Sequence, residues 1–186
     1  MKKTTLLEKI KLGLASLYRA VHNSIFLRFK RKIKLNLGAG GTRMEGYTNV
    51  DSLLLRETDL LAELKRLPIF VTRGTVTHIY ASHIFEHFST KEIKRILKIC
   101  HSLLEKDGEL RISVPDLDKI VKMYTNHWEY FHTKGNSPLL GPIYGGQTSR
   151  YDFHKTGFNF VWISQLLEEA GFTDIKEYDA EEFTAR

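Results

Sequence analysis

The sequence contains a single cysteine, Cys100, and four prolines among its 186 residues. One cysteine excludes an internal disulfide and any zinc site built from several thiolates, and it agrees with a reducing compartment. Long apolar runs are also missing. Lys9, Lys11 and Arg19 interrupt the apolar part of the N-terminus, so no segment reaches the roughly 18 apolar residues that a membrane span needs. We therefore expect a globular, cytoplasmic protein with one domain's worth of core.

Acidic residues are scarce in the first 34 residues, which hold ten Lys and Arg against Glu8 alone, a local charge of +9 within a total of +6. This asymmetry argues against a nucleic-acid-binding face spread over the whole domain. Apolar residues recur there at helical spacing: Leu7, Ile10, Leu14, Leu17, Tyr18, Val21 and Ile25. We predict a basic amphipathic helix within residues 1–32. It either packs on its own domain or on a partner protein, or docks reversibly on the anionic face of an inner membrane.

Strand and helix patterns alternate along the rest of the chain. Apolar, β-branched runs predict strands at 33–37, 47–51, 76–81, 109–114 and 173–178. Helical spacing predicts helices at 58–67, 93–104, 117–124 and 160–170. This alternation predicts an α/β fold, a Rossmann-like and mostly parallel sheet with helices on both faces, preceded by the N-terminal helix. We expect residues 33–186 to form this one domain.

Several short signals set the boundaries of these elements. Ser89 and Glu92 form a capping box, Asp116 is an N-cap, and Gly171 lies at a helix C-cap. Asp107 and the following glycine predict a turn before the fourth strand. Residues 135–151 are rich in Gly, Pro, Ser and Asn without any period, which predicts a long loop, and such loops are often lids or binding loops.

The segment HIFEH at 83–87 has the residue order of inverted zinc metalloproteases. Those enzymes carry the motif within a helix and need a third protein ligand. Here the segment follows a strand and precedes the capping box, which places it in a turn, with a helical turn of its own as the alternative. We predict no protease and no metal site.

A different chemistry fits the same position. In open α/β sheets, ligands bind at the carboxyl ends of the strands near the point where strand order reverses. Three groups follow strands in this sequence: the glycine turn with Gly38 and Gly40, Asp51, and residues 82–87. A carboxylate beside a glycine turn is suited to accept both hydroxyls of a ribose. The order of these groups predicts a nucleoside pocket.

At these residues the chain resembles a class I S-adenosylmethionine-dependent methyltransferase, and it is particularly similar to a small bacterial branch among glycan and lipopolysaccharide assembly enzymes. The resemblance covers about residues 33–178. It rests on these motifs: LNLGAGG (35–41), GYTNVD (46–51), DL before LP (59, 60, 67, 68), YASHIFEHF (80–88), LRISVPDL (110–117), HKTGF (154–158) and LLEEAGF (166–172). The chain departs from the superfamily at Asn36, where an acid is typical, and at Thr42, where a third glycine is typical. It also ends soon after residue 178, so the last antiparallel hairpin of that fold is expected to be truncated.

The resemblance implies S-adenosylmethionine as cofactor and assigns its contacts. Gly38, Ala39 and Gly40 would pass close to its methionine part, with Asn36 at the place of the usual acid. Asp51 would hold the ribose. The remaining contacts would be Asp59 and Leu60 beside the adenine, and Ser82 with His83 near the sulfonium.

Methylation of a hydroxyl needs a base with a pKa near neutral, and histidine is the usual candidate. His83, His87 and His154 compete for this role, with Glu86 as an orienting carboxylate. His154 follows the long loop and is our first choice for contact with the acceptor. The alternative for Glu86 and His87 is a polar network that pins the loop to the sheet.

Three functions stay open at this point. The first is methyl transfer to a saccharide or another small polar acceptor. The second is a non-catalytic, cofactor-binding adaptor in a glycan-assembly complex. The third, an RNA methyltransferase, draws on the basic arm but lacks an aromatic platform for stacking bases.

Overall fold

The structure is a computed structural model that describes residues 6–133 and 139–179. The chain divides into two compact units. Unit 1 comprises residues 1–82 and 99–112, and unit 2 comprises residues 83–98 and 113–186.

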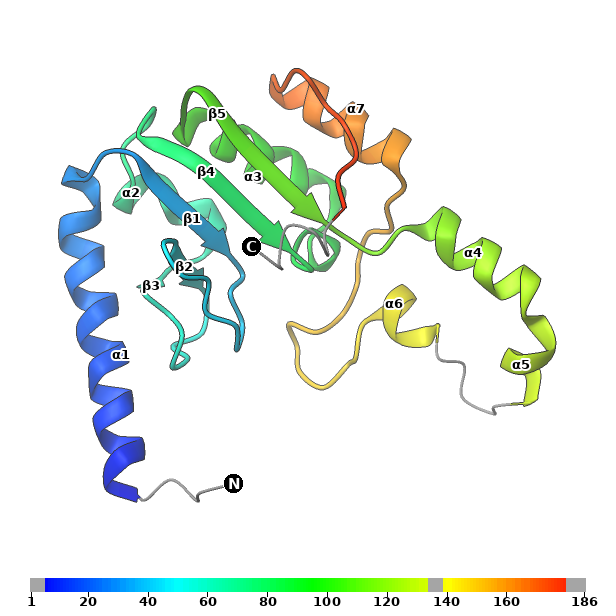
Figure 1. Cartoon of the computed structure of the whole chain (residues 1–186), viewed down its shortest axis with the longest axis horizontal. Coiled ribbons are helices and arrows are strands. Elements are labelled where there is room, and N and C mark those ends of the chain that lie inside the picture. The colour runs from blue at the N-terminus through cyan, green and yellow to red at the C-terminus, as the bar shows by residue number, and fades with distance from the viewer. Residues whose placement is uncertain (1–5, 134–138, 180–186) are drawn as a thin grey trace. The chain divides into compact units, whose positions relative to one another are not determined.

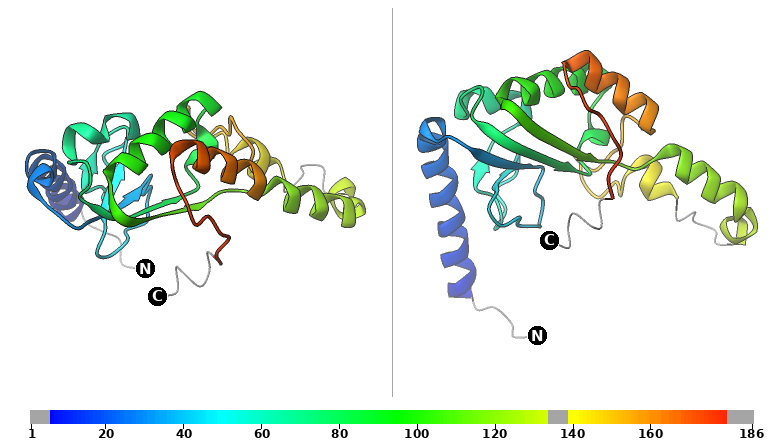
Figure 2. Two further views of the ribbon diagram at one scale, coloured as in Figure 1. Left: turned by 90° about the horizontal axis from the view of Figure 1, so that it is seen from above. Right: turned by 45° about the horizontal axis from the view of Figure 1, so that its top comes forward.

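Unit 1 is built on a five-stranded sheet with the order β3-β2-β1-β4-β5 (Figure 1). The strands are β1 (Ile33–Leu37), β2 (Thr48–Asp51), β3 (Leu60–Leu61), β4 (Val76–Ser82) and β5 (Leu104–Ser113). β1 pairs in parallel with both β2 and β4, and β2 pairs in parallel with β3. The arrow of β5 runs in the same direction as that of β4, and the sheet has a visible twist (Figure 2). Strands predicted at 33–37, 47–51 and 76–81 are thus confirmed.

The central strand explains why this sheet forms. Four of the five residues of β1 are buried and only Lys34 is exposed. A nearly continuous apolar run of this kind is typical of a parallel strand that is covered on both faces. Val50, Val76 and Ile79 of the two neighbouring strands are buried as well.

The helical elements of unit 1 are α1 (Leu6–Phe26), η1 (Leu27–Phe29), η2 (Leu64–Arg66) and α2 (Leu67–Phe70). The helix predicted at 58–67 is wrong. Its first part is β3, because Leu60 pairs with Val50 of β2 and buries its side chain completely. Its last part is the short η2. Pro68 stands in the first turn of α2 and opens that helix instead of ending an earlier one.

A carboxylate at the start of β3 fastens α1 to the sheet. Asp59 Oδ1 lies 3.2 Å from Arg19 Nε of α1 and 2.9 Å from Arg43 Nη1. The Asp59 backbone carbonyl accepts a hydrogen bond from Asn23 Nδ2 of the same helix at 2.9 Å. Burial of Asp59 favours its neutral form, but hydrogen bonds from Asn49 and Arg43 outweigh burial and hold the pKa of Asp59 below its usual value.

Unit 2 is mostly helical. Its elements are η3 (Phe85–His87), the first part of α3 (Thr90–Leu103), α4 (Leu117–Asn126), α5 (Trp128–Thr133), α6 (Leu140–Tyr144) and α7 (Phe160–Ala170). The Asp116 side chain accepts hydrogen bonds from two backbone amides at the start of α4, and Gly171 ends α7 at φ 101°. Glu92 Oε2 accepts from the Ser89 amide at 3.0 Å. These three boundary predictions are therefore confirmed.

Three other expectations differ from the structure. Residues 173–178 form no strand within the described part of the chain, and Asp174 has φ 54°, which interrupts an extended backbone. β5 begins at Leu104, ahead of the turn expected at Asp107, whose φ of 63° is accommodated inside the strand. α6 lies within the predicted loop of 135–151, although residues 134–138 are outside the described residues.

The fold class is the predicted one: an α/β architecture with a parallel five-stranded sheet, flanking helices and an N-terminal helix. Among the described helices, none combines the length and the apolar character that crossing a membrane requires.

Asp59→Asn should lower the free energy of unfolding by about 2 kcal/mol at pH 7, because two arginines lose a buried carboxylate partner. The folded pKa lies below the unfolded value of 3.8, so this contribution is complete well above pH 3.8 and is lost as pH falls through the folded pKa. Denaturant unfolding at neutral and at acid pH measures the difference, which should shrink in acid. Asp174→Asn, a substitution of an 88% exposed side chain, is the control and should change stability by less than about 0.5 kcal/mol. An equal loss for both variants would contradict the anchoring role.

Candidate functional site

Three strands of unit 1 end at one edge of the sheet. Leu37, the last residue of β1, is in register with Val50 of β2 and with Ala81 of β4. The chain runs from β1 to β2 on one side and later returns to β4 on the other, so the strand order reverses at β1. This is the topological switch point at which open α/β sheets bind their ligands.

The glycine turn after β1 and the acid after β2 meet at this edge. Gly38 and Gly40 have φ values of 64° and 54°, in the left-handed region that favours glycine. The Gly40 amide donates a hydrogen bond to Asp51 Oδ2 at 2.8 Å, and the Leu53 amide donates to Asp51 Oδ1 at 2.8 Å. Ala39 between the glycines is buried and donates to the Val50 carbonyl at 3.1 Å. The glycine turn and the Asp51 carboxylate are thus held together by a direct hydrogen bond. A Cβ placed on Gly40 would meet no atom within 4 Å, so the space beside the turn is open.

Asn36 faces a buried polar chain that the sequence reasoning missed. Asn36 Nδ2 donates to Asn49 Oδ1 at 2.9 Å, and Asn49 Nδ2 donates to Asp59 Oδ2 at 2.9 Å. Asn49 is fully buried and also accepts from the Met44 amide. A polar residue in the middle of a predicted buried strand was the signal that pointed to it.

Asp59 and Leu60, expected beside an adenine, have other contacts here. The Leu60 side chain is completely buried, and the Asp59 carboxylate is held by Asn49, Arg43 and Arg19. Their proximity to a base therefore stays a prediction.

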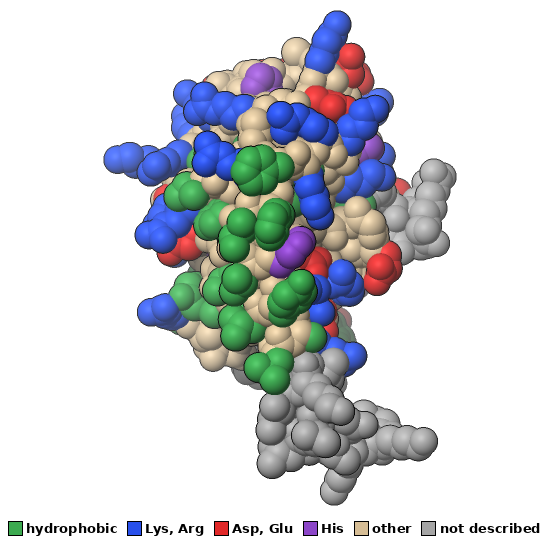
Figure 3. Space-filling view, turned by 90° about the vertical axis from the view of Figure 1, so that its left-hand side faces the viewer, with side chains coloured by type: hydrophobic (Ala, Val, Ile, Leu, Met, Phe, Trp, Pro, Cys, Tyr) green, Lys and Arg blue, Asp and Glu red, His purple; other side chains and the backbone are tan. Residues whose placement is uncertain are grey.

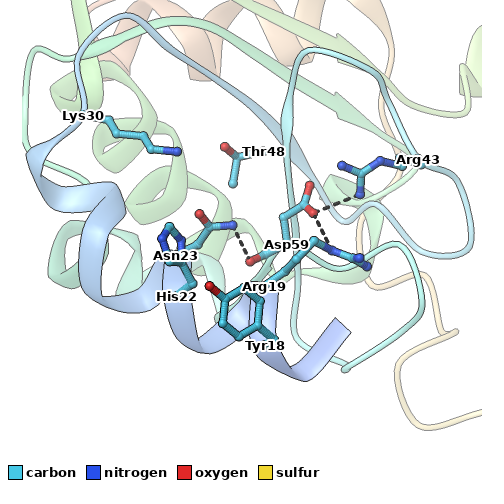
Figure 4. Close-up of a pocket in the computed structure, with 8 residues that line it drawn as sticks. All are labelled: Tyr18, Arg19, His22, Asn23, Lys30, Arg43, Thr48 and Asp59. Atoms are coloured by element: carbon cyan, nitrogen blue, oxygen red, sulfur yellow. Dashed lines mark hydrogen bonds and ion pairs between the residues drawn. The ribbon is translucent and has the colours of Figure 1, made fainter. Parts of the chain in front are cut away.

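An open pocket of about 340 Å³ lies beside α1 (Figure 4). It is lined by Tyr18, Arg19, His22, Asn23, Lys30, Arg43, Thr48 and Asp59. None of Gly38, Gly40 and Asp51 contributes to it. The Asp59 carboxylate that lines this pocket is already paired with Arg19 and Arg43.

The expected catalytic residues all belong to unit 2 and lie in one cluster. His83 follows directly after Ser82, the half-buried last residue of β4, and adopts φ 50°, a region that residues with a Cβ seldom occupy. Its Nδ1 lies 3.3 Å from Glu86 Oε1. The contact with Glu86 raises the pKa of His83 against the opposing effect of burial. The His83 side chain is 67% exposed, whereas that of Glu86 is only 1% exposed.

His87 and His154 meet although 66 residues separate them in sequence. Their ring centroids are 4.9 Å apart in an edge-to-face arrangement. The Lys155 and Thr156 amides both donate to the Glu86 backbone carbonyl, at 2.7 and 3.2 Å, and Thr156 Oγ1 donates to the Phe88 carbonyl at 2.8 Å. These bonds fasten the segment after the long loop onto η3. The helical turn that the sequence left as the alternative for HIFEH is present as η3, and it supports one side of the cluster.

Asp152 holds together the loop that precedes His154. Its carboxylate accepts from the Thr148 hydroxyl and amide and from the Gly146 amide, and these contacts lower the pKa of Asp152. Gly145 has φ 82°, and a Cβ there would come within 2.2 Å of the Asp152 carbonyl oxygen. The segment 145–152 is therefore a tightly turned loop, and it leads directly to His154, whose ring contacts that of His87.

The sequence matches no protein-family model, and the curated proteins include no match to it. Among solved structures, the chain is similar to the crystal structure of a SAM-dependent methyltransferase from Archaeoglobus fulgidus. The TM-score is 0.53 at 16% identity, over 95% of this chain and 78% of the other. The chain therefore shares the fold of that structure, a Rossmann-like parallel sheet with flanking helices. At this identity the likeness establishes the architecture, and the glycine turn with Asp51 lies where such a fold binds its ligand.

Proposed function

We propose that the protein transfers a methyl group from S-adenosylmethionine to a small polar acceptor, a saccharide or glycan intermediate. The observation that carries the proposal is the contact between the Gly40 amide and the Asp51 carboxylate at the switch point of a methyltransferase-like sheet. The glycan class of the acceptor rests on the sequence motifs, and the methyl transfer on the fold together with this contact.

The residues at the sheet edge suit the cofactor. The Asp51 carboxylate is 9% exposed and each of its oxygens accepts one backbone hydrogen bond, which leaves lone pairs for the two ribose hydroxyls. The left-handed turn at Gly38 and Gly40 allows a ligand to approach the backbone closely. The bound cofactor would supply an electrophilic methyl group on a sulfonium. The chain would contribute position and the exclusion of water.

The histidine cluster is our proposal for the acceptor side. His83 presents an exposed ring whose Nδ1 faces Glu86, so Nε2 is the nitrogen that would contact an acceptor hydroxyl and take its proton. His154 and His87 remain proposed acceptor contacts, with Glu86 as the group that orients His83. Among the three histidines that compete for the role of base, this assignment chooses His83, because its ring is the most exposed; His154 is the first choice from sequence for contact with the acceptor.

We also propose that α1 docks on an anionic membrane face. The helix exposes its large apolar side chains on one stripe, with exposures of 61% for Leu14, 70% for Tyr18 and 55% for Ile25. The side that packs on the rest of unit 1 carries small or polar residues. Ser16 and Ala20 are 2% and 6% exposed, and Arg19 and Asn23 bind Asp59. This is the reverse of a helix whose apolar stripe faces its own core.

Positive charge borders the apolar stripe (Figure 3). Arg28, Lys30, Arg31 and Lys32 follow α1 and are all exposed, as is Phe29 at 76%. Apolar side chains next to a basic run favour an anionic lipid surface, since the former enter the acyl boundary and the latter pair with headgroups.

Asp51→Asn should weaken S-adenosylmethionine binding at least about tenfold, because a neutral amide accepts hydrogen bonds from the ribose hydroxyls less strongly than a carboxylate. Isothermal titration calorimetry with the cofactor and with S-adenosylhomocysteine measures this, and Asp174→Asn is the matched control. If the unaltered protein binds neither compound, the methyl-transfer proposal fails. Binding without turnover on any acceptor would favour the adaptor instead.

His83→Gln should reduce kcat at least about 100-fold, because the imidazole that would take the acceptor proton is lost. The measurement is transfer of a tritiated methyl group to candidate saccharides and glycan intermediates. His127→Gln, at an exposed position after α4, is the control. Unchanged turnover of the His83 variant would remove this residue from the mechanism.

The full chain should sediment with vesicles of phosphatidylcholine and phosphatidylglycerol, and much less with phosphatidylcholine alone. Val21→Glu should weaken this binding at least about tenfold, because the charge would enter the apolar stripe. Val161→Glu, which alters a valine that is 63% exposed on α7, should bind as the unaltered chain does. Absence of binding, or a dimer in solution that Val21→Glu dissociates, would refute the membrane assignment; in the second case the stripe would instead join two copies.

A further inference from the structure

The most buried carboxylate of unit 2 has no hydrogen-bonding partner among the described residues. The Glu86 side chain is 1% exposed, and neither of its carboxylate oxygens accepts a hydrogen bond there. His83 Nδ1 comes within 3.3 Å of Oε1, which is an ion-pair distance without the alignment of a hydrogen bond. A buried charge in this condition is costly unless it binds a cation.

The two neighbouring histidines have their tautomers set by the backbone. His87 Nδ1 is 3.2 Å from the Phe153 carbonyl oxygen, and His154 Nδ1 is 3.0 Å from the Pro142 carbonyl oxygen. A carbonyl oxygen can only accept a hydrogen bond, so each Nδ1 carries the proton and each Nε2 retains a lone pair. Histidines that bind metals are typically held in this way, with the other ring nitrogen donating to a backbone carbonyl.

The three side chains converge. One ligand atom from each of Glu86, His87 and His154 lies within 4.8 Å of the others. Bond lengths of about 2.0–2.1 Å in a tetrahedral zinc site place ligand atoms roughly 3.3–3.5 Å apart, so the ligand atoms need to approach one another by at most about 1.5 Å. Both histidines are only half-buried, which leaves their rings room to turn.

We propose that Glu86, His87 and His154 bind a divalent first-row transition metal ion of the zinc type. Two imidazoles and one carboxylate form a ligand set that binds such ions and leaves a fourth position open. This site differs from the metalloprotease pattern that HIFEH resembles, because the second histidine comes from the segment after the long loop and not from His83. It also departs from our expectation from the sequence that no metal would bind.

The site goes beyond the proposed methyl transfer and does not depend on it. A bound ion would occupy Nε2 of His87 and His154, so these two rings would act as ligands while His83 stays outside the coordination. Metal binding and thermal stability can be measured whether or not methyl transfer occurs, so they test this site independently.

Zinc binding to the full chain, purified without a polyhistidine tag and freed of metal by a chelator, tests the proposal. We expect one ion per chain by calorimetry, and Co²⁺ should give the visible absorption of a tetrahedral site. His87→Gln and His154→Gln should each weaken binding at least about 100-fold, since each variant loses one of three ligands. His127→Gln, which replaces an exposed histidine of the same unit, should bind as the unaltered chain does.

Thermal unfolding separates a metal site from a merely structural network. Zinc at about 100 times its Kd should raise Tm of the unaltered chain by roughly 5 °C or more, and the shift should vanish in Glu86→Gln. Without metal, Glu86→Gln should have a higher Tm than the unaltered chain, because a neutral amide replaces a buried carboxylate that accepts no hydrogen bond from the described residues. Zinc binding that survives all three substitutions, or a metal-free Glu86→Gln protein with a lower Tm, would overturn the proposal.

Discussion

The hydrogen bond from the Gly40 amide to the Asp51 carboxylate joins the ends of the two strands on which the rest of unit 1 is arranged. It exists because β1 lies between β2 and β4 in parallel register, so that their carboxyl ends reach one edge together. The left-handed turn at Gly38 and Gly40 then points a backbone amide at a carboxylate. If β1 shifted by one residue, its side chains would change faces and the turn would no longer reach Asp51.

Behind this edge, unit 1 uses buried polar groups in place of an uninterrupted apolar core. Asn36, Asn49 and Asp59 form a chain of hydrogen bonds across β1, β2 and the start of β3, and Arg19 extends it to α1. Because these buried groups need polar partners, the network favours one arrangement of the helix on the sheet. This arrangement leaves the apolar stripe of α1 facing outward.

Unit 2 shows the opposite condition around Glu86. Its backbone carbonyl accepts two hydrogen bonds that hold the segment carrying His154, while its carboxylate accepts none from described residues. The backbone of Glu86 thus supports the cluster, while its buried carboxylate lies near the two histidines. His83, three residues before Glu86, has an unusual φ, and the tight loop around Asp152 comes directly before His154.

Local rules were sufficient for much of this protein. The strand at 33–37, the capping box at Ser89, the N-cap at Asp116 and the C-cap at Gly171 depend on neighbours in sequence, and the motifs placed Gly40 and Asp51 at strand ends. The same rules failed at 58–67 and 173–178, because a strand exists only if another strand pairs with it, and pairing is not a local property. Packing between segments far apart in the chain decided the rest. It buries the polar side of α1 instead of the apolar one, places Asn49 between Asn36 and Asp59, and brings His87 to His154. Hydrophobic spacing predicts that a helix has an apolar face, but it cannot say whether that face or the polar one will touch the sheet; here the buried carboxylate of Asp59 attracted the polar face.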